Sequence, residues 1–236
     1  MKKDNSNYIF KLVSIESIDV DDQLTSFSLS IPKDSLQQSI QEVGIIHPIT
    51  LAPLGNLFQT VCGHSRIKIA SQLKINLIPA RILDSAPSKE SMLMLNLSEN
   101  QFHHNYSDIE KGFILSKLSV VKVPEIRIIE KYMPMLGLEK SKKLLDDHLS
   151  ANQFVSSLKI LLHEMNIPLR VFSVFFSWDK ENILAAVRFF SVLRPGANKL
   201  RDLLEWIEEI STRDEVTPLT LFELPELKSV LNQNDL

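Results

Sequence analysis

The segment VCGHSRIKIA at residues 61–70 constrains the fold of this chain more than any other part. Apolar residues before Gly63 predict a strand, and apolar residues at helical spacing after it predict a helix, with Ser65 placed to cap that helix. Glycine lets the backbone approach a bound group closely, and the free N–H groups at a helix start attract anions. The segment therefore predicts an α/β unit that can hold a phosphate, with Arg66 adding bidentate donors. The competing interpretation is an ordinary strand–helix turn with Arg66 solvated at the surface.

The other patterns of the first part alternate in the same way and predict a compact α/β domain over residues 1–106. A helical apolar stripe that stops at Gly44 precedes two strands joined by a tight turn. The expected elements are a helix up to Gly44, strands over 44–53 and 57–62 with a turn at 54–56, a strand over 75–83, and a helix from Ser88 to Leu97.

The second part, residues 107–236, is predicted to be helical, so that the whole chain belongs to the α+β class. Ser107 and Glu110 form a capping box, in which hydroxyl and carboxylate satisfy free N–H groups at a helix start. Six phenylalanine and tryptophan residues between 172 and 190 are expected to form helical core rather than a base-stacking platform. Further helices are expected at roughly 124–135, 139–147, 151–163, 168–176, 179–193 and 197–211.

Composition narrows the function classes. A net charge of −3 argues against a protein that is basic all over and coats nucleic acid, although a local basic face is compatible with it. The single cysteine permits no internal disulfide, and no apolar run approaches the length of a membrane span. We therefore expect no signal peptide and no membrane segment. We expect a cytoplasmic location.

A second polar segment, LSENQFHHN at residues 97–105, suggests a cation site. Magnesium prefers oxygen ligands and often joins a carboxylate to substrate phosphates, so Glu99 and Asn100 are candidate ligands. His103 is a candidate phosphate contact; zinc is not expected, because adjacent histidines lack the usual ligand spacing. An ordinary polar helix end is the alternative. Cys62 is interpreted as a small core residue, with a thiol nucleophile as the alternative.

The order of these segments resembles the N-terminal domain of ParB-type chromosome and plasmid partition proteins, a fold shared with sulfiredoxin. Three segments carry the resemblance, which covers roughly residues 10–120: GIIHPITL at 44–51, GHSRIKIA at 63–70 and ENQFH at 99–103. The chain also departs from the family pattern at positions that matter for the site. Ser65 and His103 stand where the family has arginines.

The resemblance implies a site for cytidine triphosphate and magnesium. Glu99 and Asn100 would serve the metal, and Glu99 would be the catalytic residue if the chain hydrolyses CTP, a point left open. The implied nucleotide-binding residues are Gly63, His64, Ser65, Arg66, Asn100 and His103.

The resemblance extends more faintly to a helix-turn-helix-like segment at 138–169, which implies DNA binding and allows a homodimer. Its first helix would be 141–149 and its reading helix 151–162, which carries a single lysine. The implied DNA contacts are Asn152, Gln153, Ser156 and Lys159.

Three functions therefore compete. The first is a ParB-like nucleotide-binding protein that engages DNA in partition or transcriptional regulation. The second is a phosphotransferase on the same fold that acts on a small molecule. The third is a non-catalytic protein in which the helical part binds a protein partner.

Overall fold

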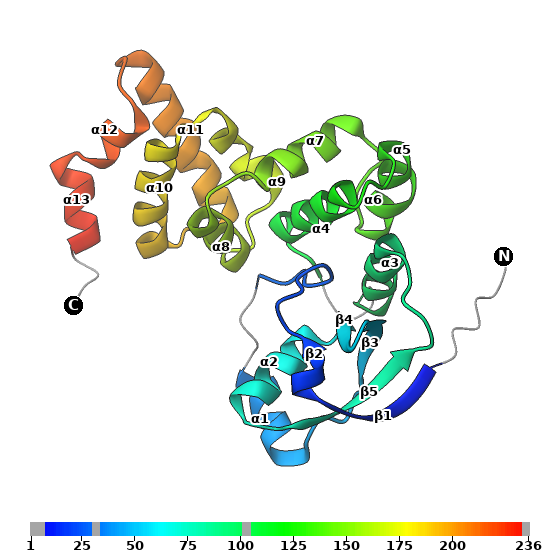
Figure 1. Ribbon diagram of the computed structural model, residues 1–236. Coiled ribbons are helices and arrows are strands. Elements are labelled where there is room, and N and C mark those ends of the chain that lie inside the picture. The colour runs from blue at the N-terminus through cyan, green and yellow to red at the C-terminus, as the bar shows by residue number, and fades with distance from the viewer. Residues whose placement is uncertain (1–7, 30–33, 101–104, 233–236) are drawn as a thin grey trace. The chain divides into compact units, whose positions relative to one another are not determined.

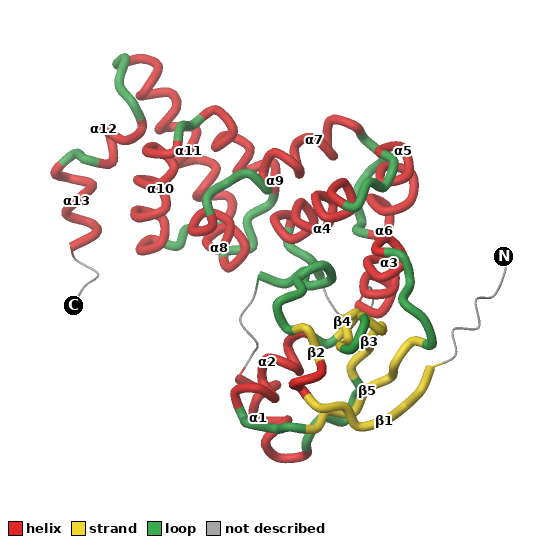
Figure 2. Tube along the Cα trace, viewed as in Figure 1, coloured by secondary structure: helices red, strands yellow, loops and turns green. Residues whose placement is uncertain are grey.

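A computed structural model describes residues 8–29, 34–100 and 105–232 (Figure 1). Contacts divide the chain into two compact units: residues 1–105 with 117–124, and residues 106–116 with 125–236. A mixed sheet of five strands belongs to the first unit and helices make up the second, as Figure 2 shows by colour. The α+β class expected from the sequence is confirmed.

The sheet has the strand order β1-β5-β3-β4-β2. β1 runs antiparallel to β5 and β3 antiparallel to β4, whereas β3 is parallel to β5 and β2 parallel to β4. The strands are β1 (Tyr8–Ser14), β2 (Ile18–Asp19), β3 (Ile49–Leu54), β4 (Leu57–Cys62) and β5 (Leu77–Leu83), and a short 3-10 turn (Ile15–Ser17) joins the first two.

Three helices accompany the sheet: α1 (Asp34–Val43), α2 (His64–Gln72) and α3 (Lys89–Asn100). α1 stops where expected, because Gly44 takes a φ of +74° and donates its N–H to the carbonyl of Ile40 at 3.0 Å. The tight turn between β3 and β4 is also confirmed, with Gly55 at a φ of +58°.

The expectation for the strand over 44–53 was wrong in its first residues, since β3 begins only at Ile49. Pro48 has no N–H to give to a strand ladder. In addition, the carbonyls of His47 and Pro48 accept hydrogen bonds from a side chain, Arg66, rather than from a neighbouring strand.

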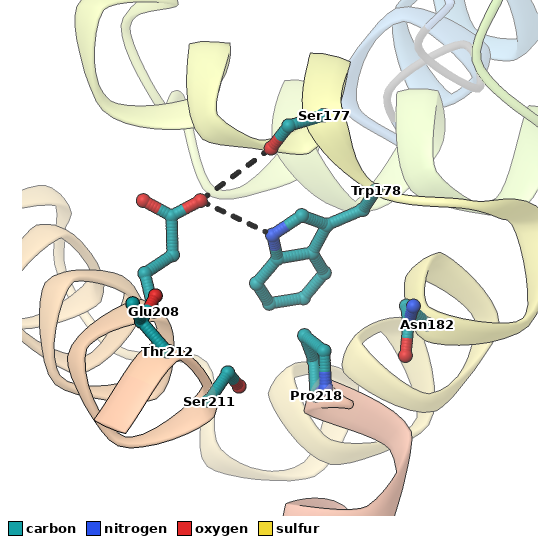
Figure 3. Close-up of a pocket in the computed structure, with 7 residues that line it drawn as sticks. All are labelled: Ser177, Trp178, Asn182, Glu208, Ser211, Thr212 and Pro218. Atoms are coloured by element: carbon teal, nitrogen blue, oxygen red, sulfur yellow. Dashed lines mark hydrogen bonds between the residues drawn. The ribbon is translucent and has the colours of Figure 1, made fainter. Parts of the chain in front are cut away.

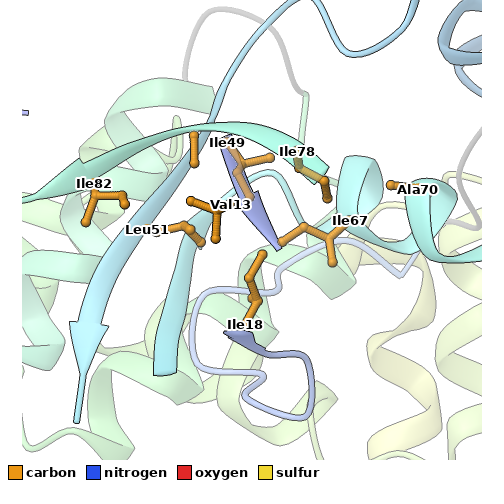
Figure 4. Packing of buried hydrophobic residues seen from close by; sticks show 9 residues of the cluster. Val13, Ile18, Ile49, Leu51, Ile67, Ala70, Ile78 and Ile82 are labelled. Carbon is orange, nitrogen blue, oxygen red and sulfur yellow. The ribbon is translucent and has the colours of Figure 1, made fainter. Parts of the chain in front are cut away.

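Both faces of the sheet are covered. On one face, alternate strand residues such as Ile49 and Leu51 pack with Ile67 and Ala70 of α2 (Figure 4). On the other face, Val61 and Cys62 of β4 pack with Met92 of α3. The glycine between β4 and α2 therefore lies where strand, helix and core meet.

α4 (Asp108–Val120) contributes its first nine residues to the second unit, and its capping box is confirmed. The Ser107 N–H donates to Glu110 Oε2 at 3.0 Å, and the Glu110 N–H donates to Ser107 Oγ at 3.3 Å. The elements that follow are α5 (Glu125–Arg127), a π turn (Ile128–Tyr132), α6 (Met133–Met135), α7 (Lys142–Ala151), α8 (Ser156–Glu164), α9 (Leu169–Phe172), a 3-10 turn η3 (Ser173–Ser177), α10 (Lys180–Leu193), α11 (Ala197–Arg213), α12 (Pro218–Phe222) and α13 (Pro225–Asn232).

The start of the second helix in the 138–169 segment was wrong by five residues: α8 begins at Ser156, not at 151. Residues 152–155 instead form a turn, in which the N–H groups of Gln153 and Phe154 bond three residues back along the chain. The expected aromatic core is confirmed for Phe172, Phe175, Phe189 and Phe190, all of them buried. It was wrong for Phe176, which is exposed, and Trp178 is only partly buried. Within the described residues, no helix is long and apolar enough to cross a membrane.

Candidate functional site

The junction between β4 and α2 turns at Gly63, which has a φ of +106°. An ideal Cβ built there would lie 2.6 Å from Ile49 Cγ2, so only glycine fits without displacing the core. Gly63 is also the residue before the first helical turn, whereas Ser65 lies inside that turn. The expectation that Ser65 caps the helix was therefore wrong.

Arg66 is held in place rather than solvated. Its Nη1 donates to the carbonyl of His47 at 2.5 Å and to that of Pro48 at 2.8 Å, and Nη2 lies 3.7 Å from Glu99 Oε1. Its side chain is only 20% exposed, and burial lowers its pKa although Glu99 opposes that effect. The interpretation of Arg66 as an ordinary surface side chain is thus wrong.

Glu99 is the centre of the cluster. Its carboxylate pairs with Arg81 of β5 through Oε2 and also accepts from Thr50 Oγ1 at 3.3 Å. Arg81 Nε in turn donates to Thr50 Oγ1 at 2.6 Å, and its guanidinium lies 5.3 Å from the centre of the Tyr8 ring. Two guanidinium groups and one carboxylate leave the cluster with one net positive charge.

Arg81 was missed by the sequence analysis. Its signal is a single charged residue within the otherwise apolar strand LIPARIL. An arginine at such a position needs an acidic partner, and that partner, Glu99, lies 18 residues away in the chain. The register of β3 with β5 pairs Thr50 with Arg81 and so completes the group.

Asn100, although adjacent to Glu99, points elsewhere. Its Nδ2 donates to the carbonyl of Asn96 at 3.0 Å and to Asn96 Oδ1 at 2.7 Å. Asn96 is itself buried and bonded to the carbonyls of Thr25 and Val61. The two expected magnesium ligands are therefore not brought together.

Magnesium held by the protein alone does not fit this arrangement, because the Glu99 carboxylate is already paired with two cations. No group of three or more histidine, cysteine, aspartate or glutamate residues that could hold a metal occurs in the part of the chain that the structure describes. His103, the other expected phosphate contact, lies outside the described residues.

His64 points into the unit rather than toward a ligand. Its Nε2 lies 2.9 Å from Thr25 Oγ1, and that hydroxyl donates its own proton to the carbonyl of Thr60 at 2.6 Å. Thr25 is therefore the acceptor, and Nε2 carries the proton of a neutral imidazole. Burial, assisted by the charge of Lys117, lowers the pKa of His64 to about 4.

This buried histidine predicts a loss of stability in acid. The pKa of His64 is about 4 in the folded state and near 6.5 in the unfolded state, so the unfolded state binds more protons between these values. The stability present above pH 6.5 is then lost as the pH falls toward 4, by about 2–3 kcal/mol from this group. Urea denaturation between pH 7 and pH 4.5 measures it.

Its control is His64→Gln, which keeps an N–H donor for Thr25 but does not titrate. His148 is also buried with a lowered pKa and contributes to the same trend, so the variant should flatten the profile only in part. If wild type and His64→Gln lost stability equally over this range, the assignment to His64 would fail.

Cys62 is sealed in the core. The residue is 2% exposed, and burial raises the pKa of its thiol, with the negative charge of Glu99 acting in the same direction. A thiolate nucleophile is disfavoured at such a position. The interpretation of Cys62 as a core residue is confirmed.

The four expected DNA contacts lie around the turn between α7 and α8. Gln153 and Ser156 are exposed, whereas Asn152 is partly buried and donates from Nδ2 to Ser116 Oγ at 3.0 Å. Lys159 Nζ donates back to the carbonyl of Asn152 at 3.1 Å. These residues thus form one group, in which two side chains are engaged within the unit and two are available at its surface.

Comparisons with known proteins place the sequence in context. Residues 3–101 match the family model of the ParB N-terminal domain. The chain is 24% identical over 119 residues to a probable chromosome-partitioning protein ParB of Borreliella burgdorferi, covering 48% of this chain and 45% of that protein. It is 26% identical over 110 residues to a probable plasmid-partitioning protein ParB of Thermus thermophilus, covering 47% of this chain and 36% of that protein. The matches thus span less than half the length of either relative.

Two solved structures also resemble the chain at low sequence identity. A Pnob8-like ParB-N domain is 15% identical with a TM-score of 0.43, covering 95% of this chain and 93% of that one. A C-terminally truncated chromosome-partitioning protein ParB from Caulobacter crescentus, complexed with CTP-gamma-S, is 16% identical with a TM-score of 0.34, covering 83% of this chain and 98% of that one.

The sequence match includes both segments from which the candidate site is built, the glycine junction and the Glu99 helix end. The resemblance to the ParB-type partition proteins is confirmed. Over residues 3–101 this chain is therefore similar in sequence to the ParB N-terminal domain.

Proposed function

We propose that this chain is a ParB-like protein that binds CTP in its N-terminal domain and engages DNA through its helical part. The observation that carries the nucleotide part is the convergence of Arg66 and Arg81 on the single carboxylate of Glu99, next to the glycine junction. Such a cluster has an excess of positive charge, and a triphosphate brings more negative charge than one carboxylate. Phosphate oxygens would therefore compete with Glu99 for the two guanidinium groups.

Arg81 supplies a second guanidinium at this site, where Ser65 stands in place of the arginine expected from the family resemblance. The family resemblance expects an arginine at that position, and its absence removes one phosphate contact. Arg81 reaches the same carboxylate from β5 and supplies a second guanidinium from a different element. Magnesium enters this proposal bound to the nucleotide phosphates, with the protein contributing at most a single oxygen.

The nucleotide part is tested by calorimetric titration of the full chain with CTP and magnesium, and with ATP and magnesium for comparison. CTP should bind preferentially, and Arg66→Ala should weaken that binding about 100-fold, since two charge-assisted hydrogen bonds to phosphate are lost. Arg66 also holds two backbone carbonyls, so thermal unfolding is measured alongside. Arg81→Ala is a second variant for the same measurement of CTP affinity, and it leaves the hydrogen bonds from Arg66 to the two carbonyls intact.

Lys68→Ala is the matched control. It removes one positive charge from the same helix, but Lys68 is exposed and stands two positions beyond Arg66, which turns its side chain to the opposite side. Its affinity should stay within about twofold of wild type. Unchanged affinity in both arginine variants would overturn the site, and preferential binding of ATP would favour phosphotransfer instead.

The DNA part rests on the turn-linked helices α7 and α8 and on the exposed side chains at the start of α8. With one lysine in this group, few phosphate contacts are available, so affinity should be low and should fall with salt. The affinity for DNA and its salt dependence are measured by titrating the same preparation with duplex DNA at two salt concentrations. Each titration is done with and without CTP. Binding that is absent or insensitive to salt would remove DNA from the proposal and favour a protein partner.

A further inference from the structure

A separate cavity of about 310 Å³ lies in the helical unit, between η3, α10, α11 and the start of α12 (Figure 3). Trp178 and Glu208 of α11 both line it, and the Glu208 carboxylate lies next to the indole nitrogen of Trp178. All lining residues belong to the second unit, and none of them was singled out as a site residue by the sequence analysis.

Glu208 has unused capacity to accept hydrogen bonds. Its Oε1 receives only two long contacts, from Ser177 Oγ and from the indole Nε1 of Trp178, both at 3.4 Å. Among the described residues, no lysine, arginine or histidine pairs with this carboxylate, although nearby acids such as Glu205 do have such a partner. The cavity therefore carries a negative charge that the unit itself leaves uncompensated.

Ser211 supplies a second, independent observation at the same cavity. Its Oγ is buried at the cavity and has no hydrogen-bond partner in the structure. A buried hydroxyl without a partner is unfavourable, so a group that bonds to it gains binding energy. Ser211 lies three residues after Glu208, just short of one helical turn, and therefore on the same side of α11.

We propose that this cavity binds the guanidinium group of an arginine side chain from a basic segment of a partner protein. Carboxylate, indole and hydroxyl together offer an ion pair, a cation–π contact and an acceptor, all of which suit a planar cation with several donors. Another carboxylate, Glu205, lies three residues before Glu208 on the same side of α11, so that a segment with more than one positive charge fits better than a single free cation. This inference does not depend on the nucleotide proposal.

Tryptophan fluorescence of the full chain tests the proposal. The chain has two tryptophans, so Trp206→Phe leaves Trp178 as the only reporter. An arginine-containing pentapeptide should change the emission saturably, whereas the same peptide with citrulline, which is neutral, should not. Glu208→Gln should weaken arginine-peptide binding about tenfold, as expected for loss of a charge-assisted contact.

Glu209→Gln is the matched control, since it removes the same charge from the neighbouring position outside the cavity. Its affinity should change less than twofold. Equal affinities of the two variants, or equal binding of the citrulline peptide, would overturn the proposal. If arginine methyl ester bound as tightly as the peptide, the ligand would be a small cation and the protein partner would be ruled out. Glu208 is exposed, so both variants should fold, and circular dichroism checks this.

Discussion

Replacing Gly63 by alanine should lower the free energy of unfolding of the N-terminal unit by about 3 kcal/mol or more. Two effects add. The φ of +106° is strained for any residue with a Cβ, and that Cβ would lie 2.6 Å from Ile49 Cγ2 and 3.0 Å from its Cβ. Ile49 is fully buried and branched at Cβ, so it cannot rotate away. Urea denaturation followed by circular dichroism measures the loss.

Gly55→Ala separates the two effects. Gly55 has a φ of +58°, yet nothing lies within 4 Å of a Cβ built there. This variant should therefore lose only about 1 kcal/mol, the cost of the backbone conformation. If the two alanine variants were equally stable, close packing would not be the reason for a glycine at position 63, and the junction would tolerate a side chain.

The second large effect is expected at Gly112→Ala, within α4. A Cβ there would lie 2.5 Å from the carbonyl oxygen of His148 in α7. The obstacle is backbone, so no side-chain rotation relieves it, and one helix has to shift. We expect a loss of about 2–4 kcal/mol, although alanine favours an isolated helix over glycine by about 1 kcal/mol.

Gly196→Ala is the control for this second variant. Gly196 also borders a helix, α11, but has no atom within 4 Å of a built Cβ and no unusual φ. Its free energy of unfolding should change by less than about 1 kcal/mol. A Gly112→Ala protein as stable as wild type, or more stable, would show that helix propensity decides at this site and that α4 and α7 are free to move apart.

Structural features that depend on residues close together in the sequence could be predicted from it. The capping box at Ser107, the stop of α1 at Gly44 and the two-residue turn at Gly55 depend on bonds that span three or four residues. The glycine junction of the candidate site belongs with them, because a strand and a helix that meet at one glycine leave few other conformations. The length of the apolar stripes likewise predicted where most of the helices between 125 and 213 begin and end, to within a few residues.

Structural features that depend on contacts between residues far apart in the sequence could not be predicted in this way. Arg81 and Glu99 meet because β5 lies beside β3 and α3 covers the sheet, an arrangement that no local pattern contains. The late start of β3 has the same origin, since Arg66 takes the carbonyls that would otherwise join a ladder. Asn100 turns toward Asn96 because Asn96 is itself fixed by carbonyls in a distant loop and strand.

The sequence by itself determined the order of elements, the α+β class and the motif residues Gly63, Arg66 and Glu99. Only the tertiary structure decided how these residues are used: which arginines neutralise Glu99, that His64 and Cys62 belong to the interior, and that a charged cavity faces Trp178. The physical reason is the distance along the chain over which each interaction acts. Backbone preferences and caps act over one helical turn, whereas the partners of a buried charge are chosen by whichever elements pack against it.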